Sequence, residues 1–314
     1  MRLLLAPMEG LLDFMLRDVL TRIGGIDHCV TEFIRITNTV LPKRSILRIA
    51  PELQNDSKTA AGVPVKVQIL GSDPICMADN AAHIASMGAW AIDLNFGCPA
   101  KTVNRHRGGA VLLDEPELIF DIARAVRSAV PASIPISAKM RLGCNDTGKM
   151  LDCARAFADA GMQELVVHGR TKVQGYKPPA YWHHIAEIKH AINIPVIANG
   201  EIWSIEDYWQ CRRESECDDI MLGRGMVQNP ALALMIRQGE QEKLSWSQMQ
   251  PWLLQFWLQV QQHVDARHQG GRLKQWFNYL RDEYPEASED FAMIRTMTKA
   301  DEISAYLFAD RKAA

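Results

Sequence analysis

The sequence lacks long apolar runs and a strong excess of charge of either sign. No segment of the 314 residues reaches the roughly 18 consecutive apolar residues that a membrane-spanning helix needs. Three leucines open the chain, but Pro7 and Glu9 interrupt them before they reach the length of a secretory signal. We therefore expect no membrane segment. The formal net charge is only -2, so a nucleic-acid partner would have to meet local clusters of positive charge.

Paired-cysteine motifs are missing as well. The seven cysteines are odd in number and form no C-x-x-C pair, which disfavours a disulfide framework and a zinc site. A reducing cytoplasm suits this usage best. His183, His184 and Glu187 do not follow the H-E-x-x-H pattern, so we expect an exposed helix start there and no metal.

Nucleotide-binding loops of the common kinds are absent too. No G-x-G-x-x-G follows an apolar run and no G-x-x-x-x-G-K-[ST] occurs, which disfavours a Rossmann domain and a nucleoside-triphosphate loop. What the chain has instead is a repeated pattern of short apolar, β-branched runs. These lie at 3–8, 28–33, 63–70, 91–95, 134–142, 165–168, 194–198 and 219–222.

Segments with helical periodicity separate most of these runs, at 74–87, 116–130, 149–160, 181–191 and 205–213. Strand followed by helix, repeated eight times, predicts an α/β fold of the (β/α)8 TIM-barrel type, which we place at 1–235. After about residue 232 the pattern is helical only and rich in aromatic residues. It predicts a smaller all-helical C-terminal domain at 236–314.

Polar residues end these apolar runs, and in a barrel the strand ends converge on the face that carries the active site. Cys98 follows the run 91–95 in a Gly/Pro turn, where a thiol could act chemically or could equally be a small buried hydrophobe. The segments 199–201 and 223–225 lie where barrels often bind a phosphate. Lys139 would be costly to bury without an anion, and either a flavin or a Schiff-base substrate could partner it.

Several of these strand-end motifs together resemble the tRNA-dihydrouridine synthases. The resemblance extends over nearly the whole predicted barrel. The segments that carry it are 5–10 (LAPMEG), Gln68, 93–99 (DLNFGCP), 139–141 (KMR), 167–171 (VHGRT), 197–202 (IANGEI) and 221–225 (MLGRG). The motif Pro-Met-Glu-Gly and the C-terminal segment 272–276 (RLKQW) are most like the bacterial C-type branch, which reduces uridine 16 of the tRNA D-loop.

The resemblance implies FMN as the cofactor and NADPH as the electron donor. It implies that FMN is held by Pro7, Met8, Glu9, Gln68, Lys139, His168, Asn199, Gly200, Glu201, Gly223 and Arg224. It also implies tRNA as the partner, with Asn95 and Arg141 holding the flipped uridine. The residues implied to orient the rest of the tRNA are Arg35, Arg272, Lys274, Tyr279 and Arg295. We expect a monomer, because one tRNA would span both domains.

The expected reaction reduces the C5=C6 bond of the uracil ring. Hydride from the N5 atom of FMN adds at C6, and the resemblance assigns delivery of the proton at C5 to Cys98. A thiol with a pKa of about 8.5 is mostly protonated at neutral pH and can serve as a general acid, so we expect no strongly lowered Cys98 pKa. Two alternatives are an FMN-dependent reductase of a small pyrimidine or enone, and an RNA-binding module without catalysis.

One loop departs from the pattern of related enzymes. Residues 105–107 read Arg-His-Arg, where relatives tend to have small residues and glycines. Contact with RNA phosphate and simple solvation both account for this charge.

Overall fold

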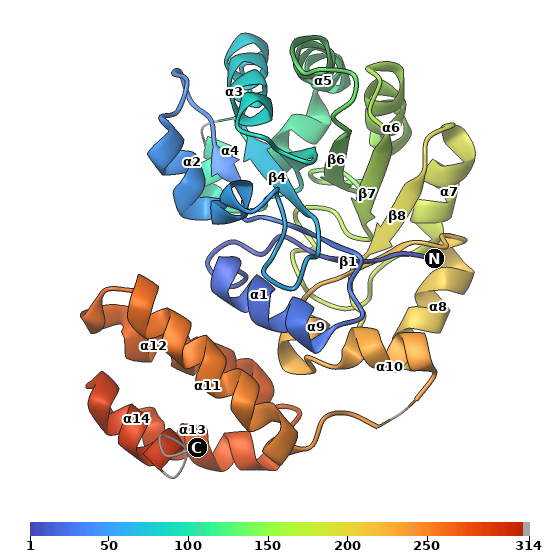
Figure 1. Ribbon diagram of the computed structural model, residues 1–314. Helices are drawn as coiled ribbons and strands as arrows, with labels where there is room; N and C mark the ends of the chain where they lie inside the picture. Colours follow the sequence, from blue (N-terminus) through green and yellow to red (C-terminus); the bar gives the residue numbers. More distant parts are fainter. Residues whose placement is uncertain (106, 241, 310–314) are drawn as a thin grey trace.

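The computed structural model describes residues 1–105, 107–240 and 242–309. His106 of the Arg-His-Arg loop lies outside this range, as do Gln241 and the last five residues of the expected helical domain. Within it, a ring of parallel strands is surrounded by helices, and a second group of helices lies on one side of the ring (Figure 1).

Eight strands close into a parallel barrel, which confirms the expected TIM-barrel fold. Each predicted apolar run overlaps one of them. The barrel strands are β1 (Leu3–Leu5), β2 (His28–Val30), β4 (Val65–Leu70), β5 (Ile92–Phe96), β6 (Ile136–Arg141), β7 (Glu164–His168), β8 (Val196–Asn199) and β9 (Ile220–Leu222). The ring closes because β1 pairs with both β9 and β2, and β2 pairs with β4. A short extra strand that the sequence did not predict, β3 (Ile34–Arg35), also pairs with β4.

The helices of the barrel follow the strands in the expected order. They are α1 (Phe14–Ile23), α2 (Lys43–Ile49), α3 (Pro74–Ser86), α4 (Lys101–Arg105), α5 (Pro116–Ala129), α6 (Met150–Asp159), α7 (His183–Ala191), α8 (Ile205–Ser215), α9 (Arg224–Gln228) and α10 (Leu232–Gln238). Local sequence sets several starts. Asp73 accepts a hydrogen bond from the Cys76 backbone N–H at 2.7 Å ahead of Pro74, and Ser204 and Asp207 form a capping box.

Side chains on the barrel strands alternate between the outer core and the barrel interior. On β6, Ala138 and Met140 belong to the large core that the helices cover, while Ser137, Lys139 and Arg141 alternate with them on the other face. The part of the interior near β1, β2 and β7 to β9 is apolar instead. Its cluster consists of Leu4, Ala6, Val30, Val166, Ile197 and Met221.

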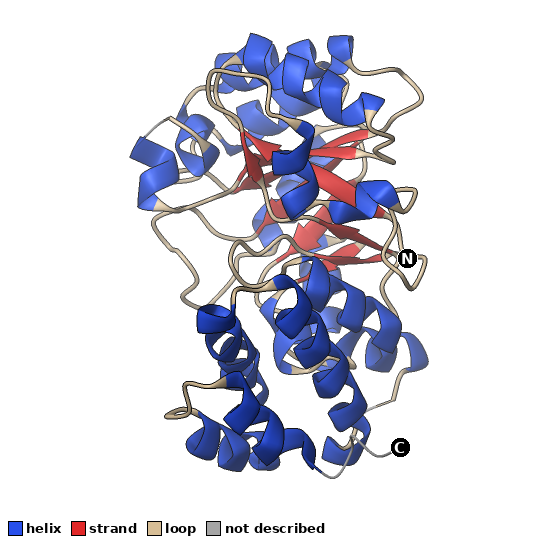
Figure 2. Cartoon of the chain, turned by 60° about the vertical axis from the view of Figure 1, so that its left-hand side comes forward, coloured by secondary structure: helices blue, strands red, loops and turns tan. Residues whose placement is uncertain are grey.

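The C-terminal part contains α11 (Trp246–His263), α12 (Ala266–Leu280), α13 (Pro285–Ile294) and α14 (Ala300–Phe308), with no strand among its described residues. Figure 2 shows these helices gathered beneath the strands. The boundary expected between residues 235 and 236 falls inside α10, which packs on α8 and α9. The separate group of helices therefore begins with α11. In the described part of the chain, no helix combines the length and the apolar character needed to cross a membrane.

The helical part is joined to the barrel by specific contacts. Trp276 on α12 is buried and donates a hydrogen bond of 3.0 Å to the carbonyl of Val227 on α9. Arg272 donates to the carboxylate of Asp13 at 2.7 Å and to the carbonyl of Leu11 at 2.8 Å. These bonds place α12 beside the loop that follows β1.

Candidate active site

A pocket of about 620 Å³ opens at the carboxyl ends of the strands, and α12 forms part of its wall through Gln275 and Tyr279. A pocket of this size is in the range that binds small ligands and cofactors. It brings together ten of the eleven predicted cofactor residues: Pro7, Met8, Glu9, Gln68, Lys139, His168, Asn199, Gly200, Gly223 and Arg224. Three of the predicted tRNA residues, Asn95, Arg141 and Tyr279, also line it.

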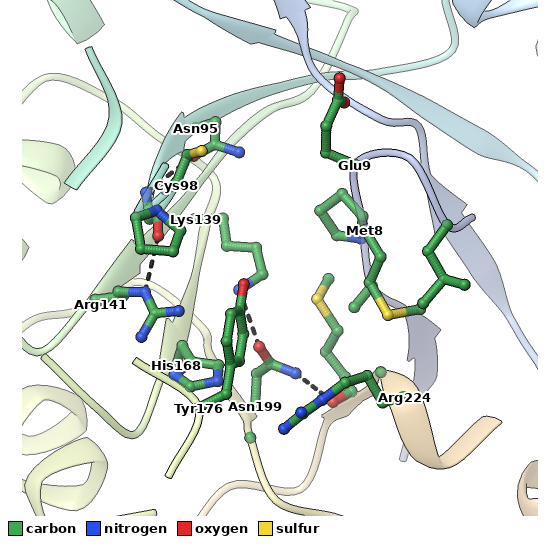
Figure 3. A pocket seen from close by; sticks show the side chains of 18 of the residues that line it. Met8, Glu9, Asn95, Cys98, Lys139, Arg141, His168, Tyr176, Asn199 and Arg224 are labelled. Carbon is green, nitrogen blue, oxygen red and sulfur yellow. Dashed lines mark hydrogen bonds between the residues drawn. The ribbon is translucent and has the colours of Figure 1, made fainter. Parts of the chain in front are cut away.

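Cys98 lies in the pocket wall on a loop whose backbone is hydrogen-bonded from several directions. The side-chain oxygen of Asn95 accepts from the backbone N–H of Gly97 at 2.9 Å and of Cys98 at 3.0 Å. Arg141 Nε donates to the Gly97 carbonyl at 2.8 Å. Figure 3 shows Cys98 and Arg141 on one side of the pocket, with Met8 and Glu9 opposite. The thiol is thus held in place at a strand end, where the sequence predicted it.

The environment of Cys98 favours the protonated thiol. Burial raises the pKa of Cys98, and the carboxylate of Glu9 raises it further. Burial, together with repulsion from Glu32, also raises the pKa of Glu9 to about 7. These directions agree with the expectation that Cys98 is not an activated thiolate.

Lys139 crosses the barrel interior toward β8. Its ammonium group donates a hydrogen bond of 2.9 Å to Asn199 Oδ1, and the amide nitrogen of Asn199 donates to the Met221 carbonyl at 2.8 Å. Burial, followed by repulsion from Arg141, lowers the pKa of Lys139 to about 7. An anion placed beside this amine would reverse that shift. The site therefore suits a ligand with negative charge at this point.

Tyr176 is a pocket residue that the sequence analysis missed. Its ring lies between two guanidinium groups, with Arg141 Cζ 5.1 Å and Arg224 Cζ 4.9 Å from the ring centre. Arg224 also lies over the ring of Trp203, at 5.0 Å. The available signal was an aromatic residue in a Gly- and Pro-containing loop directly after a predicted strand end.

Glu201 is near the pocket but does not line it. Its carboxylate pairs with the buried guanidinium of Arg170, accepts from Trp203 Nε1 at 3.1 Å and lies 3.9 Å from Arg224 Nη2. It therefore places negative charge beside Arg224 from outside the pocket lining. Glu201 and Gly200 both have positive φ, at 57° and 116°, and a Cβ on Gly200 would lie 3.3 Å from His168 Nε2.

His168 supplies a test of whether the pocket fits a flavin phosphate. Its ring is buried, and Nδ1 has no hydrogen-bond partner among the described residues. Burial, then the positive charges of Arg141 and Lys139, lowers the pKa of His168 well below its usual value, so the ring is neutral. A buried ring nitrogen without a partner, beside Lys139 and Arg224, fits a polar anionic cofactor.

The remaining residues predicted to contact tRNA differ in their exposure and in their hydrogen bonds within the protein. Arg35 on β3 and Arg295 after α13 are exposed. Lys274 donates to the carbonyls of Arg295 and Met297. Arg272 is only 11% exposed and is engaged by Asp13 and Leu11, so in this structure it joins α12 to the barrel.

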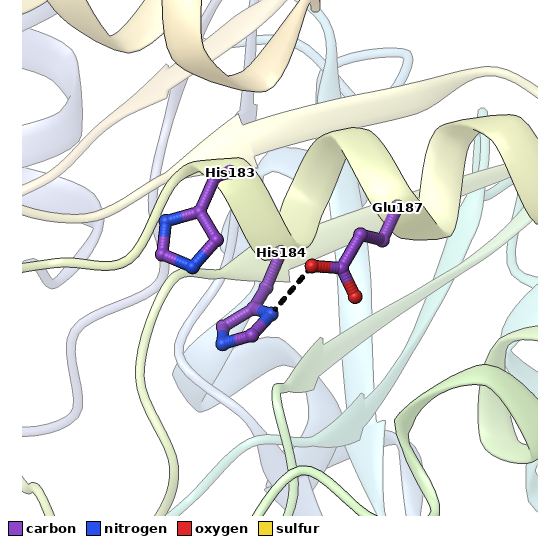
Figure 4. Close-up of side chains that lie close together, drawn as sticks. All are labelled: His183, His184 and Glu187. Atoms are coloured by element: carbon purple, nitrogen blue, oxygen red, sulfur yellow. Dashed lines mark hydrogen bonds and ion pairs between the residues drawn. The ribbon is translucent and has the colours of Figure 1, made fainter.

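His183, His184 and Glu187 form a cluster at the start of α7, on the outside of the barrel. Their possible ligand atoms lie within 4.8 Å of one another, although their order in the sequence matches no zinc motif. His184 Nδ1 and Glu187 Oε1 are 3.0 Å apart and form a hydrogen bond (Figure 4). This cluster does not line the pocket.

Comparison with known proteins identifies the family. The family model described as dihydrouridine synthase matches residues 4–304. The chain belongs to the dihydrouridine synthase family. This agrees with the resemblance seen in the strand-end motifs, and it defines the enzyme class as an oxidoreductase.

Individual relatives match nearly the full length of this dihydrouridine synthase. A protein of Aquipseudomonas alcaligenes named tRNA-dihydrouridine(16) synthase is 55% identical, with 98% of this chain and 99% of that protein covered. A protein of the same name from Pseudomonas syringae pv. tomato is 50% identical, with 100% of each chain covered. Another, from Neisseria meningitidis serogroup B, is 47% identical, with 96% of this chain and 92% of that protein covered.

Solved structures show the same barrel at low sequence identity. An old yellow enzyme homologue from Zymomonas mobilis superposes with a TM-score of 0.53 at 13% identity, covering 79% of this chain and 91% of that one. At this identity the likeness concerns the fold alone.

Proposed function

We propose that this protein reduces uridine 16 of the tRNA D-loop to 5,6-dihydrouridine, using FMN as cofactor and NADPH as electron donor. The observation that carries the proposal is the place of Cys98 in the wall of a cation-lined pocket at the strand ends, where burial raises the pKa of the thiol. Full-length relatives named tRNA-dihydrouridine(16) synthase support the choice of substrate and position.

FMN would be held by the predicted residues that line the pocket, and bound FMN supplies the two electrons of the reduction. Lys139 and Arg224 offer positive charge to the ring and the phosphate, and His168 Nδ1 offers a free ring nitrogen. Glu201 contributes indirectly, because its carboxylate lies beside the Arg224 guanidinium.

Cys98 would deliver the proton that completes the reduction at uracil C5. The raised pKa of the thiol keeps the proton available at neutral pH, and the hydrogen bonds of Asn95 and Arg141 to the loop keep the sulfur at the pocket wall. Arg141 is itself buried and bonded to Gly97, Thr171 and Gly175. We propose that it serves the uridine as part of a rigid wall.

The uridine must leave its stack in the D-loop to reach this pocket, at a cost of a few kcal/mol that other contacts offset. Arg35 and Arg295 are the exposed candidates for phosphate contacts, and Tyr279 on α12 is a candidate for contact at the pocket mouth. Lys274 and Arg272 are the other two candidates for contact with RNA. Both already form hydrogen bonds within the protein, so they would contact RNA while keeping those bonds.

We further propose that the protein works as a monomer in the cytoplasm. All seven cysteines are free thiols in the structure, which is consistent with a reducing compartment. A single tRNA would contact the barrel and the C-terminal helices together.

A spectroscopic titration tests the whole proposal. The purified protein should be yellow, bleach on addition of NADPH, and regain colour on addition of tRNA lacking dihydrouridine, with the reduced base mapped to position 16. Reoxidation by small pyrimidines or enones but not by tRNA would favour a small-molecule reductase. Colourless protein that still binds tRNA after FMN is supplied would favour an RNA-binding module.

A further inference from the structure

The barrel interior contains a carboxylate, Asp93 on β5, that the reaction above does not use. Asp93 is only 1% exposed, and no cation lies within ion-pair distance of it among the described residues. Burying a carboxylate without an ion pair is costly unless hydrogen bonds offset the loss of water. Its two oxygens accept from Gln68 Nε2 at 2.7 Å and from Ser137 Oγ at 2.6 Å.

The bond to Gln68 is the first link of a chain that ends at the catalytic loop. Gln68 Oε1 accepts from Asn95 Nδ2 at 2.7 Å, and Asn95 Oδ1 accepts from the backbone N–H groups of Gly97 and Cys98. Gln68 is fully buried and Asn95 is 9% exposed, so water competes little for these bonds.

The polarity of this chain is determined at both ends. Asp93 Oδ2 accepts from Gln68 Nε2, so the amine end of the Gln68 amide faces Asp93. The oxygen of Gln68 then faces Asn95 and requires the amine end of that amide. The oxygen of Asn95 is left facing two backbone N–H groups, which only donate. A side chain unable to accept at position 93 would leave the buried Gln68 Nε2 without an acceptor, so the chain from Gln68 to Asn95 would lose its support at that end.

The loop has a second set of bonds, which act on its carbonyl groups. Arg141 Nε bonds the Gly97 carbonyl, and the Cys98 carbonyl accepts from Asn104 Nδ2 at 2.9 Å and from the Ala110 N–H at 3.1 Å. The N–H groups of Gly97 and Cys98 therefore depend on Asn95, while the carbonyls are held independently of it.

We propose that Asp93 is a positioning residue that orients the amides of Gln68 and Asn95 and thereby holds the backbone of Gly97 and Cys98 at the pocket wall. The inference rests on the proposed function for its purpose, since it keeps the Cys98 thiol where a proton is needed. Its geometry does not depend on tRNA or NADPH.

Hydrogen exchange tests this chain directly in the purified protein with its bound cofactor, without NADPH or tRNA. In Asp93→Leu the Gln68 amine loses its acceptor, so exchange in peptides spanning Gly97 and Cys98 should accelerate by about tenfold. Asp93→Asn keeps an oxygen for Gln68 and can turn its amine toward Ser137, so exchange should stay within about twofold of wild type. Gln68→Met removes the bond between Gln68 and Asn95, so exchange at Gly97 and Cys98 should accelerate to the same extent. This variant keeps the test available if Asp93→Leu does not fold.

Ser137→Ala is the matched control, because it removes the other bond to Asp93 and leaves the link to Gln68. It should leave the Gly97 and Cys98 amides protected. A second readout is the tRNA reaction, in which Asp93→Leu should lower kcat with little change in KM while Asp93→Asn restores kcat.

Three outcomes would overturn the proposal: unchanged exchange at Gly97 and Cys98 in both Asp93→Leu and Gln68→Met, equal acceleration in Ser137→Ala, or acceleration spread evenly over β4, β5 and β6. Failure of the proposed function is distinct from these. In that case wild-type protein would not reduce tRNA, although the exchange pattern of the variants would still follow the chain.

Discussion

Lys139 on β6 and Asn199 on β8 are joined across the intervening strand β7 by a hydrogen bond of 2.9 Å between Nζ and Oδ1. The bond holds the amine in the middle of the pocket, where burial lowers its pKa to about 7. A bound anion would favour the ammonium form and offset the free-energy cost of burying its charge.

Removing the amine should weaken flavin binding. We expect Lys139→Met to raise the Kd for FMN by between about tenfold and a hundredfold. The reason is the loss of one charge-assisted hydrogen bond, which contributes about 1.5 to 3 kcal/mol. Titration of the FMN-free protein by fluorescence quenching measures it. Lys177→Met, which removes an exposed lysine outside the pocket lining, is the control and should bind normally. Equal affinity of Lys139→Met and wild type would contradict an anion at this point.

Removing the thiol should separate the two half-reactions. We expect Cys98→Ala to be reduced by NADPH at the normal rate, while reoxidation by tRNA slows by about 10² to 10⁴, the usual contribution of a general acid. Stopped-flow absorbance of the flavin follows both steps, and tRNA affinity should hardly change. Cys76→Ala serves as control, since Cys76 is the other half-buried cysteine and lies outside the pocket lining. A normal reoxidation rate in Cys98→Ala would exclude the thiol as proton donor.

The pH dependence of Cys98 follows from the direction of its pKa shift. Because burial raises this pKa, the thiol keeps its proton at neutral pH and loses it only above the ordinary range near 8.5. Alkylation of Cys98 by iodoacetamide should therefore be slow at pH 7 and accelerate only in alkaline solution. Glu9→Gln removes a negative charge that raises the thiol pKa, so its alkylation curve should move to lower pH. Rapid alkylation of the wild type below pH 7 would show an activated thiolate, unsuited to this role.

The Tyr176 ring should matter through its contact with two guanidinium groups. Cation–π contacts contribute about 0.5 to 2 kcal/mol, so we expect Tyr176→Ala to loosen Arg224 and lower FMN affinity by about 3- to 30-fold. Tyr176→Phe keeps the ring and should bind FMN almost normally. If the two variants lose affinity equally, the hydroxyl group and not the ring face is what the site uses.

Arg272 and Arg295 should behave differently despite their shared assignment to tRNA. Arg272→Ala leaves Asp13 Oδ2 and the Leu11 carbonyl without the guanidinium donor, so we expect a loss of about 1 to 3 kcal/mol in the free energy of unfolding as well as weaker tRNA binding. Arg295→Ala, at an exposed site, should weaken tRNA binding and flatten its salt dependence without changing Tm. Thermal melts and binding at several salt concentrations distinguish the two. An unchanged Tm for Arg272→Ala would show that its bonds to the barrel carry little stability.

The sequence predicted most of what depends on local pattern. All eight apolar runs overlap barrel strands, because a short apolar run that ends in polar residues and is followed by a helical segment is readable in one dimension. The short strand β3 was missed, since it contains only Ile34 and Arg35 and depends on pairing with β4. The boundary at residue 235 fell inside α10 for a similar reason: packing on α8 and α9, and not composition, decides that this helix covers the barrel.

The pocket was predictable as a set of strand ends but not as a network of partners. Tyr176 was missed because its part in the pocket depends on cation–π contacts with Arg141 and Arg224, which are far from each other in the sequence. Glu201, predicted to hold FMN, does not line the pocket, and its carboxylate lies 3.9 Å from Arg224 Nη2. The spacing of residues in the sequence does not show which of several nearby arginines a carboxylate will pair with in the folded protein.

By itself, the sequence determined the barrel, the class of reaction and the position of Cys98 at a strand end, because short apolar runs and strand-end motifs are local properties. Only the tertiary structure decided which polar groups became partners. The chain of bonds from Asp93 to Cys98 joins β4 and β5, and Arg272 reaches Asp13 across 259 residues of sequence. These contacts exist because closing the barrel and docking α12 exclude water from side chains that must then hydrogen-bond one another.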